Sequence, residues 1–204
     1  MKARITHKND REIIDFPDPH FKEYLVSQFD DDGDGEISVD DALGVTTLVV
    51  VGRQIENLSG IEYFANLHTL DCSYNKLSIL DVRNNLRLRT LRCVANRIFS
   101  LKVEGCENLT SLFCSDNLIG YIDLRTNEKL AVLDCLRNKI KMLVLSKNKH
   151  LEELQADGNP LEIIEFTGEK WPIIFNVPYS ADIVELSPEI LAKIDSIRDL
   201  WDEN

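Results

Sequence analysis

A run of carboxylates near the N-terminus is the first place where residue types and spacing predict chemistry. Asp30, Asp32 and Asp34 alternate along the segment DDDGDG, whose last residue is Gly35. In a twelve-residue calcium loop, carboxylates at positions one, three and five bind the ion, and a glycine at position six permits a sharp turn. This spacing therefore predicts a Ca²⁺ site.

The rest of the loop supplies the remaining ligands of the predicted site. Position seven is the carbonyl of Glu36, position nine is Ser38, acting directly or through water, and position twelve is Asp41. An EF-hand prefers the longer Glu at position twelve, so Asp41 predicts weaker binding or an adjusted loop. The alternative is an acidic turn without an ion. Ca²⁺ is favoured because the clustered aspartates would otherwise repel one another, with no compensating Lys or Arg nearby in the sequence.

Residues 1–44 are expected to form an N-terminal tail and a helical cap that contains this loop. Pro19 can begin a helix in which Phe21, Leu25 and Phe29 share one face. The stretch 39–43 is too short for a full second helix before a strand at Val45. We therefore expect half of an EF-hand serving as a cap.

Cysteines are the second candidate for chemistry, as an oxidised scaffold or a metal site. Four of them lie 21 residues apart, and Val50 and Ala156 fill the same position in the outer repeats. A position shared with Val and Ala needs a small apolar side chain rather than a thiol, so we expect core packing. The fifth, Cys106, aligns with the asparagines of other repeats, and an odd total argues against a complete disulfide framework. The four regularly spaced cysteines are Cys72, Cys93, Cys114 and Cys135.

An enzyme is the competing class of function, and the sequence gives it little support. The histidines show no metal-ligand spacing, and no Gly-x-Ser-x-Gly, phosphate loop or Cys–His grouping occurs. His68, Asp71 and Ser73 can meet on one strand face, but nothing suggests an oxyanion hole beside them. We expect no catalytic activity.

The cysteine spacing belongs to a 21-residue repeat that runs through most of the chain. Each repeat reads L-x-x-L-x-C-x-x-N-x-φ-x-x-φ-x-φ, where φ is apolar. We number its positions from an offset of zero at the first leucine. Alternation at offsets three and five predicts a short strand, and stacked repeats give a parallel sheet. The asparagine at offset eight predicts a buried ladder of side-chain hydrogen bonds, and the spacing beyond it predicts extended or 3₁₀ structure. The first leucines are Leu67, Leu88, Leu109, Leu130 and Leu151.

The repeats are expected to span residues 45–166 as six turns. A degraded first repeat begins at Val45, where Arg53 replaces the asparagine and one residue is inserted before Leu67. After Phe166 the period is lost, which predicts a C-terminal cap over 167–204 made of a strand at 170–175 and a helix at 187–201. Trp171 and Trp201 are expected in the cap core.

These motifs together resemble the leucine-rich repeat, and the cysteine at offset five resembles the cysteine ladder of internalin-like bacterial proteins. The acidic loop is similar to those of EF-hands and dockerins. The resemblance implies an α/β solenoid with short parallel strands, a mostly non-helical convex side and helical caps at both ends. It also implies an interaction module of an exported or cell-surface bacterial protein.

A partner is expected on the concave face, at the variable offsets four and six of the strands. An aromatic anchor with apolar neighbours and a charged rim is typical of a binding hot spot. Scattered apolar surface residues are the alternative. The strip measures only about 300 to 400 Å², which suits a weak contact with a protein, a peptide or a glycan. A structural spacer in a larger surface protein is the second possibility. The candidate binding residues are Asp71, Arg92, Val94, Phe113, Asp134 and Leu136.

Composition limits the other classes of partner. The net charge of −12 argues against nucleic acid and anionic membranes, and no run of about eighteen apolar residues predicts membrane insertion. We expect a monomer. The first thirty residues lack the apolar stretch of a signal peptide, so either the protein is cytosolic or an export signal lies outside this sequence.

Overall fold

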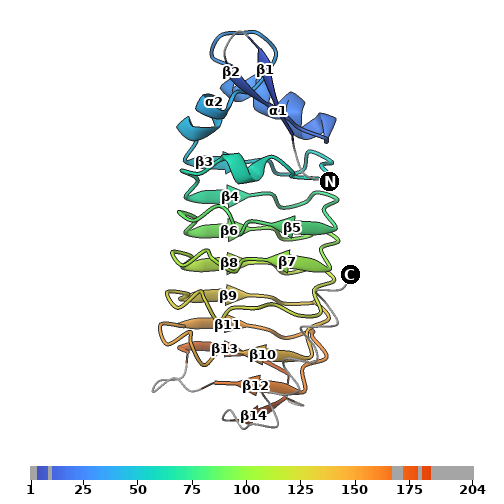
Figure 1. Ribbon diagram of the computed structural model, residues 1–204. Helices are drawn as coiled ribbons and strands as arrows, with labels where there is room; N and C mark the ends of the chain where they lie inside the picture. Colours follow the sequence, from blue (N-terminus) through green and yellow to red (C-terminus); the bar gives the residue numbers. More distant parts are fainter. Residues whose placement is uncertain (1–3, 9–10, 167–171, 179–180, 185–204) are drawn as a thin grey trace.

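The protein is an elongated stack of strands with a cap at one end, as the computed structural model shows (Figure 1). It describes residues 4–8, 11–166, 172–178 and 181–184. The N-terminal cap consists of a hairpin and two helices, and the repeats follow it along the stack. This arrangement confirms the predicted leucine-rich repeat solenoid.

The main sheet has seven parallel strands, one from each successive turn. The central residue of each strand aligns with the central residue of the next, so that Leu70 pairs with Leu48 and Leu91. From Leu48 to Leu154 these leucines are fully buried, and the residues beside them are at least partly exposed. One face of the sheet therefore forms the core, and the other is free to contact a partner. The strands are β3 (Thr47–Val49), β4 (Thr69–Asp71), β6 (Thr90–Arg92), β8 (Ser111–Phe113), β9 (Val132–Asp134), β11 (Glu153–Gln155) and β13 (Ile174–Asn176).

The opposite side of the stack is built from short strands and turns. Two small parallel sheets lie there, and the first turn carries instead a 3₁₀ helix, η1 (Ile61–Tyr63). Within the described residues no α-helix occurs between 45 and 166, in agreement with the predicted non-helical convex side. The strands are β5 (Ile79–Asp81), β7 (Ser100–Lys102), β10 (Met142–Val144), β12 (Ile163–Glu165) and β14 (Asp182–Val184).

A ladder of asparagines at offset eight connects consecutive turns, as predicted. Asn117 is representative: its Oδ1 accepts from Ile98 N at 2.9 Å, and its Nδ2 donates to the carbonyls of Cys93 and Cys114. Both ends of the buried amide are thus satisfied, which removes the cost of burying it. The other members are Asn75, Asn96, Asn138 and Asn159.

A second column of polar side chains lies at offset eighteen, the position at which Cys106 aligns with asparagines of other repeats. Asn85, Asn127 and Asn148 are fully buried, and each donates through Nδ2 to carbonyls of the preceding turn. Their Oδ1 atoms have no hydrogen-bond partner. Cys106 continues the column with its Sγ, which donates to Val82 O at 3.1 Å. This column is therefore only half satisfied.

The residue before each ladder asparagine adopts the left-handed conformation. Ala95 has φ of 55° and Asp116 has φ of 57°, although neither is glycine, and Gly158 takes the same place with φ of 74°. The tight exit from the strand requires this conformation in every turn, because the next residue must direct its amide into the ladder. For each residue that is not glycine, the left-handed conformation costs about 1 kcal/mol of folding free energy.

The N-terminal cap contains elements that the sequence analysis does not predict. Residues Arg4–Lys8 (β1) and Arg11–Asp15 (β2) form an antiparallel hairpin, in a segment for which we expected only a tail. The predicted helix is α1 (Pro19–Phe29). The stretch judged too short for a second helix forms one of six residues, α2 (Val39–Gly44), because Ser38 and Asp41 close a capping box.

Buried contacts join the cap to the first repeat. Asp18 caps α1 by accepting from His20 N and Phe21 N, and its second oxygen accepts from Glu56 N at 2.7 Å. Gly60 adopts φ of +106°, and a Cβ there would lie 2.5 Å from the ring of Phe16. The cap is therefore packed onto the stack and covers its first turn.

The main sheet continues past residue 166, where the predicted repeats end. Phe175 in β13 aligns with Leu154 in β11, and β14 pairs with β12 on the other side. The predicted strand at 170–175 thus corresponds to a seventh strand of the same parallel sheet. The predicted helix at 187–201, with Trp201, and Trp171 lie outside the described residues.

Candidate functional site

The main-sheet face, meaning the face of the seven-stranded sheet that points away from the core, carries two rows of side chains. This is the face for which the repeat pattern predicts a partner. The first row holds the offset-four residues, which the strand register places side by side: Val49, Asp71, Arg92, Phe113, Asp134, Gln155 and Asn176.

Arg92 and Phe113 form the centre of the first row. The guanidinium carbon of Arg92 lies 3.8 Å from the centroid of the Phe113 ring, a cation–π contact. Arg92 is exposed and Phe113 is half-buried. Phe113, the predicted aromatic anchor, is therefore accessible together with the Arg92 guanidinium, which covers part of one face of its ring.

The second row holds the offset-six residues, and hydrogen bonds fix its polar members. Val94 N donates to Ser73 Oγ at 3.2 Å. Ser115 Oγ donates to Asp134, whose Oδ1 also accepts from Leu136 N at 3.3 Å. The carboxylate of Asp134 is thus held in place beside the half-buried Leu136. The row contains Val51, Ser73, Val94, Ser115, Leu136 and Asp157.

The six predicted partner-binding residues therefore lie together across β4, β6, β8 and β9. Three further exposed hydrophobic side chains belong to the first two turns: Tyr74 is 65% exposed, Val49 is 48% and Val51 is 38%. The exposure of Val49 and Val51 can be predicted from their offsets in the repeat. That of Tyr74 cannot, because its backbone is left-handed, and only a glycine at this position would have indicated that conformation. These three extend the candidate surface toward the cap.

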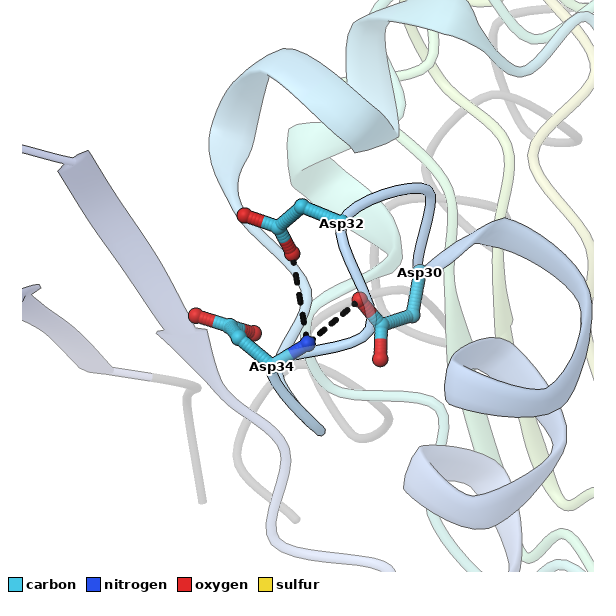
Figure 2. Close-up of side chains that lie close together, drawn as sticks. All are labelled: Asp30, Asp32 and Asp34. Carbon is cyan, nitrogen blue, oxygen red and sulfur yellow. Dashed lines mark hydrogen bonds between the residues drawn. The ribbon is translucent and has the colours of Figure 1, made fainter.

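The acidic loop brings three of its predicted ligands together. Carboxylate oxygens of Asp30, Asp32 and Asp34 lie within 4.8 Å of one another, and among the described residues this is the one cluster suited to a metal ion (Figure 2). Asp34 N donates to Oδ1 of Asp30 at 3.2 Å and to Oδ1 of Asp32 at 3.4 Å. The backbone amide of Gly35 and those of its neighbours lower the pKa of Asp30.

Arg11 supplies the positive charge that the sequence analysis does not find near this loop. Its guanidinium contacts Asp32, lies 3.7 Å from Asp34 and lies 3.0 Å from Asp41. The hairpin carries Arg11 to the loop from 21 residues away, so local sequence gives no sign of it. The argument that the aspartates lack a counter-charge is therefore wrong.

The other predicted ligands have partners within the protein. Ser38 Oγ donates to Asp41 at 2.6 Å, and Asp41 also accepts from Ser38 N in the capping box of α2. The carboxylate of Glu36, which is not the predicted ligand atom because position seven supplies its carbonyl, is ion-paired with Lys22 at 2.7 Å. The donor set thus fits Ca²⁺ at Asp30, Asp32 and Asp34, whereas Ser38 and Asp41 are engaged with each other and with Arg11.

All five cysteines are free thiols in the core, as expected from their spacing. Burial raises the pKa of each ladder thiol well above its ordinary value and raises that of Cys106 to about 12. A thiol reacts as the thiolate, so this environment opposes nucleophilic chemistry. Their function is packing.

Comparison with solved structures identifies the fold and its ladder. The functional domain of InlJ from Listeria monocytogenes, which includes a cysteine ladder, has a TM-score of 0.69 at 24% identity, over 84% of this chain. Internalin C2 from the same organism has a TM-score of 0.53 at 21% identity, over 85% of this chain and 88% of its own. The protein therefore has the leucine-rich repeat fold of these internalins.

The chain spans 43% of the length of the InlJ structure. No family model matches this sequence, and no curated protein matches it. Within the residues that the structure describes, no helix has the length and apolar character needed to cross a membrane.

Proposed function

We propose that this protein is a non-catalytic interaction module that binds a protein, peptide or glycan through its main-sheet face. The observation that carries the proposal is the Arg92–Phe113 pair at the middle of the sheet, 3.8 Å from guanidinium carbon to ring centroid. Arg and aromatic residues are enriched among the residues that dominate binding energy. A stacked pair of this kind offers an aromatic edge and a cation at one point.

The surroundings of the pair support the same proposal. Val94 and Leu136 lie in the adjacent row and give the anchor apolar neighbours, while Asp71 and Asp134 flank it in its own row. Asp134 is held by Ser115 and by Leu136 N, so its position is set before a partner arrives. A preorganised surface binds at a lower entropic cost.

Ligand selection tests the proposal. Displayed peptides and an array of glycans are probed with the wild-type chain, and ligands retained by it are measured again with Phe113→Ala. We expect a loss of at least about tenfold, because hot-spot truncation costs 2 kcal/mol or more. Leu118→Ala is the matched control, since Leu118 is 47% exposed and lies outside both rows. If no ligand is retained by the wild type, the alternative function as a structural spacer gains support.

For the acidic loop we keep Ca²⁺ binding as a separate proposal. The converging carboxylates of Asp30, Asp32 and Asp34 support it, and Ca²⁺ would cancel their mutual repulsion. Arg11 already neutralises part of that charge, so the ion must compete with the guanidinium. We expect low affinity.

A surface location completes the proposal. The internalin-like repeats and cap imply export, and fractionation of the source cells with protease treatment of intact cells tests it. Degradation of the protein in intact cells supports a surface location, and protection until lysis contradicts it.

A further inference from the structure

Strand β5 is an edge strand with backbone groups that face away from its sheet. Among the strands that the structure describes, it pairs only with β7, in parallel. Val82 N donates to Lys102 O, and Ser78 O accepts from Phe99 N, both at 3.0 Å. Because alternate residues of a strand direct their hydrogen bonds to opposite sides, the amides and carbonyls of Ile79 and Asp81 point to the other edge. No backbone group among the described residues pairs with them there.

The edge is open because the preceding turn does not supply a strand. Residues 57–59 of the first turn align with β5 but are not in a strand, and the 3₁₀ turn at Ile61–Tyr63 and one inserted residue follow them before Leu67. A hollow of about 900 Å³ lies between η1 and β5, and both elements line it. The hollow thus occupies the position beside β5 at which a strand of the first turn would otherwise pair.

The hollow combines an apolar floor with an acidic rim. Leu58 and Ile61 are almost fully buried beneath it, and Ile79 is 49% exposed at its side. Its charged lining residues are Glu56, Glu62, Asp81 and Arg83, three acidic groups against one basic group. Arg83 is ion-paired with Asp81 at 2.7 Å, so the two glutamates leave the rim negative.

We propose that β5 accepts an extended, basic peptide segment of a partner protein as an added strand. Such strand addition takes its affinity from main-chain hydrogen bonds and its specificity from side-chain pockets. Here the amides and carbonyls of Ile79 and Asp81 would supply the main-chain hydrogen bonds. The acidic rim would favour peptides that carry Lys or Arg. A second copy of this chain is disfavoured, since pairing β5 with itself would bring two acidic rims together.

This surface is separate from the main-sheet face, so its occupancy does not depend on the function proposed above. The probe is the capped hexapeptide acetyl-Lys-Val-Thr-Val-Lys-Val-amide, added to the full chain while amide NMR signals are followed. We expect saturable shifts at Ile79 and Asp81. The same peptide with alternate amides N-methylated keeps its side chains but loses main-chain donors, and it should not bind.

Charge reversal at the acidic rim is the second test of the peptide-binding proposal. Glu56→Lys should weaken binding by about threefold, as a rim charge is worth a fraction of a kcal/mol. Glu152→Lys, an exposed glutamate outside the hollow, should leave binding unchanged. Absence of shifts at Ile79 and Asp81, equal binding of the N-methylated peptide, or concentration-dependent shifts there in the chain alone would each overturn the proposal.

Discussion

Arg11 Nη2 lies 3.0 Å from Asp41 Oδ2, an ion pair that joins the N-terminal hairpin to the residue predicted to close the calcium loop. Arg11 also contacts Asp32 and lies near Asp34. One guanidinium thus partly neutralises the loop from within the protein. Any added cation must displace it, and this competition can be measured.

The first prediction concerns Arg11→Met, which keeps the length of the side chain and removes its charge. Without Ca²⁺ the variant should melt at a lower temperature than wild type, because the aspartates then repel one another. Millimolar Ca²⁺ should raise its melting temperature by about 2 to 4 °C more than that of wild type, equivalent to roughly 1 kcal/mol. Thermal unfolding with Ca²⁺ and with excess chelator measures both effects.

A matched control is Arg83→Met, which removes another ion-paired arginine outside the loop. Its response to Ca²⁺ should equal that of wild type. A Ca²⁺ response that is absent in wild type and in Arg11→Met alike would contradict the metal proposal.

The second prediction compares the two asparagine columns. Asn117→Ala leaves the buried Ile98 N without its acceptor. It also removes one of the two side-chain donors from each of the carbonyls of Cys93 and Cys114, which keep Asn96 and Asn138. This should cost about 3 kcal/mol. Asn127→Ala should cost less, about 1 to 2 kcal/mol, because the Oδ1 of Asn127 is already unpaired. Urea denaturation measures both, and equal losses would contradict the difference between the columns.

The third prediction concerns the left-handed residue of each turn. Ala95→Gly should change stability by less than about 1 kcal/mol, because relief of the left-handed strain offsets the added entropy of the unfolded chain. Gly158→Ala should lower stability by about 1 to 2 kcal/mol, since left-handed strain adds to a close contact. Its new Cβ would lie 2.9 Å from Arg137 Cγ. The unfolding midpoints of this pair test the assignment, and equal changes in both variants would argue against it.

The fourth prediction follows from the raised pKa of the buried thiols. The pKa of Cys106 is about 12 in the folded protein and about 8.5 in the unfolded chain. Between these values the unfolded chain loses the proton first, so the contribution of Cys106 to stability is constant below about pH 8.5 and falls as pH rises further. Each thiol adds a slope of about 1.4 kcal/mol per pH unit.

Cys106→Ala tests this directly. Between pH 9 and pH 10.5 the free energy of unfolding should fall less steeply in the variant than in wild type, by the contribution of one thiol to the slope. Urea unfolding at a series of pH values provides the measurement. A wild-type protein with pH-independent stability in this range would show that the thiols ionise equally in both states.

The sequence predicted the repeats well because each position has the same surroundings in every turn. In the five repeats that begin at Leu67 to Leu151, offset three is a buried leucine, and the asparagine at offset eight donates to equivalent carbonyls. Asn117 and its hydrogen bonds could therefore be inferred from spacing alone. The six partner-binding residues also lie together, because a fixed period places equal offsets side by side on a parallel sheet.

The features that escaped prediction depend on contacts between distant segments. Arg11 reaches Asp32 and Asp41 only because β1 and β2 form a hairpin over the loop. The strand near residue 175 was expected as part of a cap, but its place as the seventh strand of the main sheet was not, because only the core position at Phe175 keeps the register of the repeats. The hollow beside β5 lies where the first turn has no strand, and the residues of that turn give no local sign of its absence.

Hydroxyl-radical footprinting of the wild-type chain with a selected ligand tests the central claim most directly. The proposed binding site predicts that Phe113 and Leu136 on the main-sheet face oxidise more slowly in the complex. Phe99 and Leu118, exposed outside the two rows, should oxidise at an unchanged rate. Protection of Phe99 or Leu118 with no change at Phe113 would place the ligand elsewhere and contradict the account.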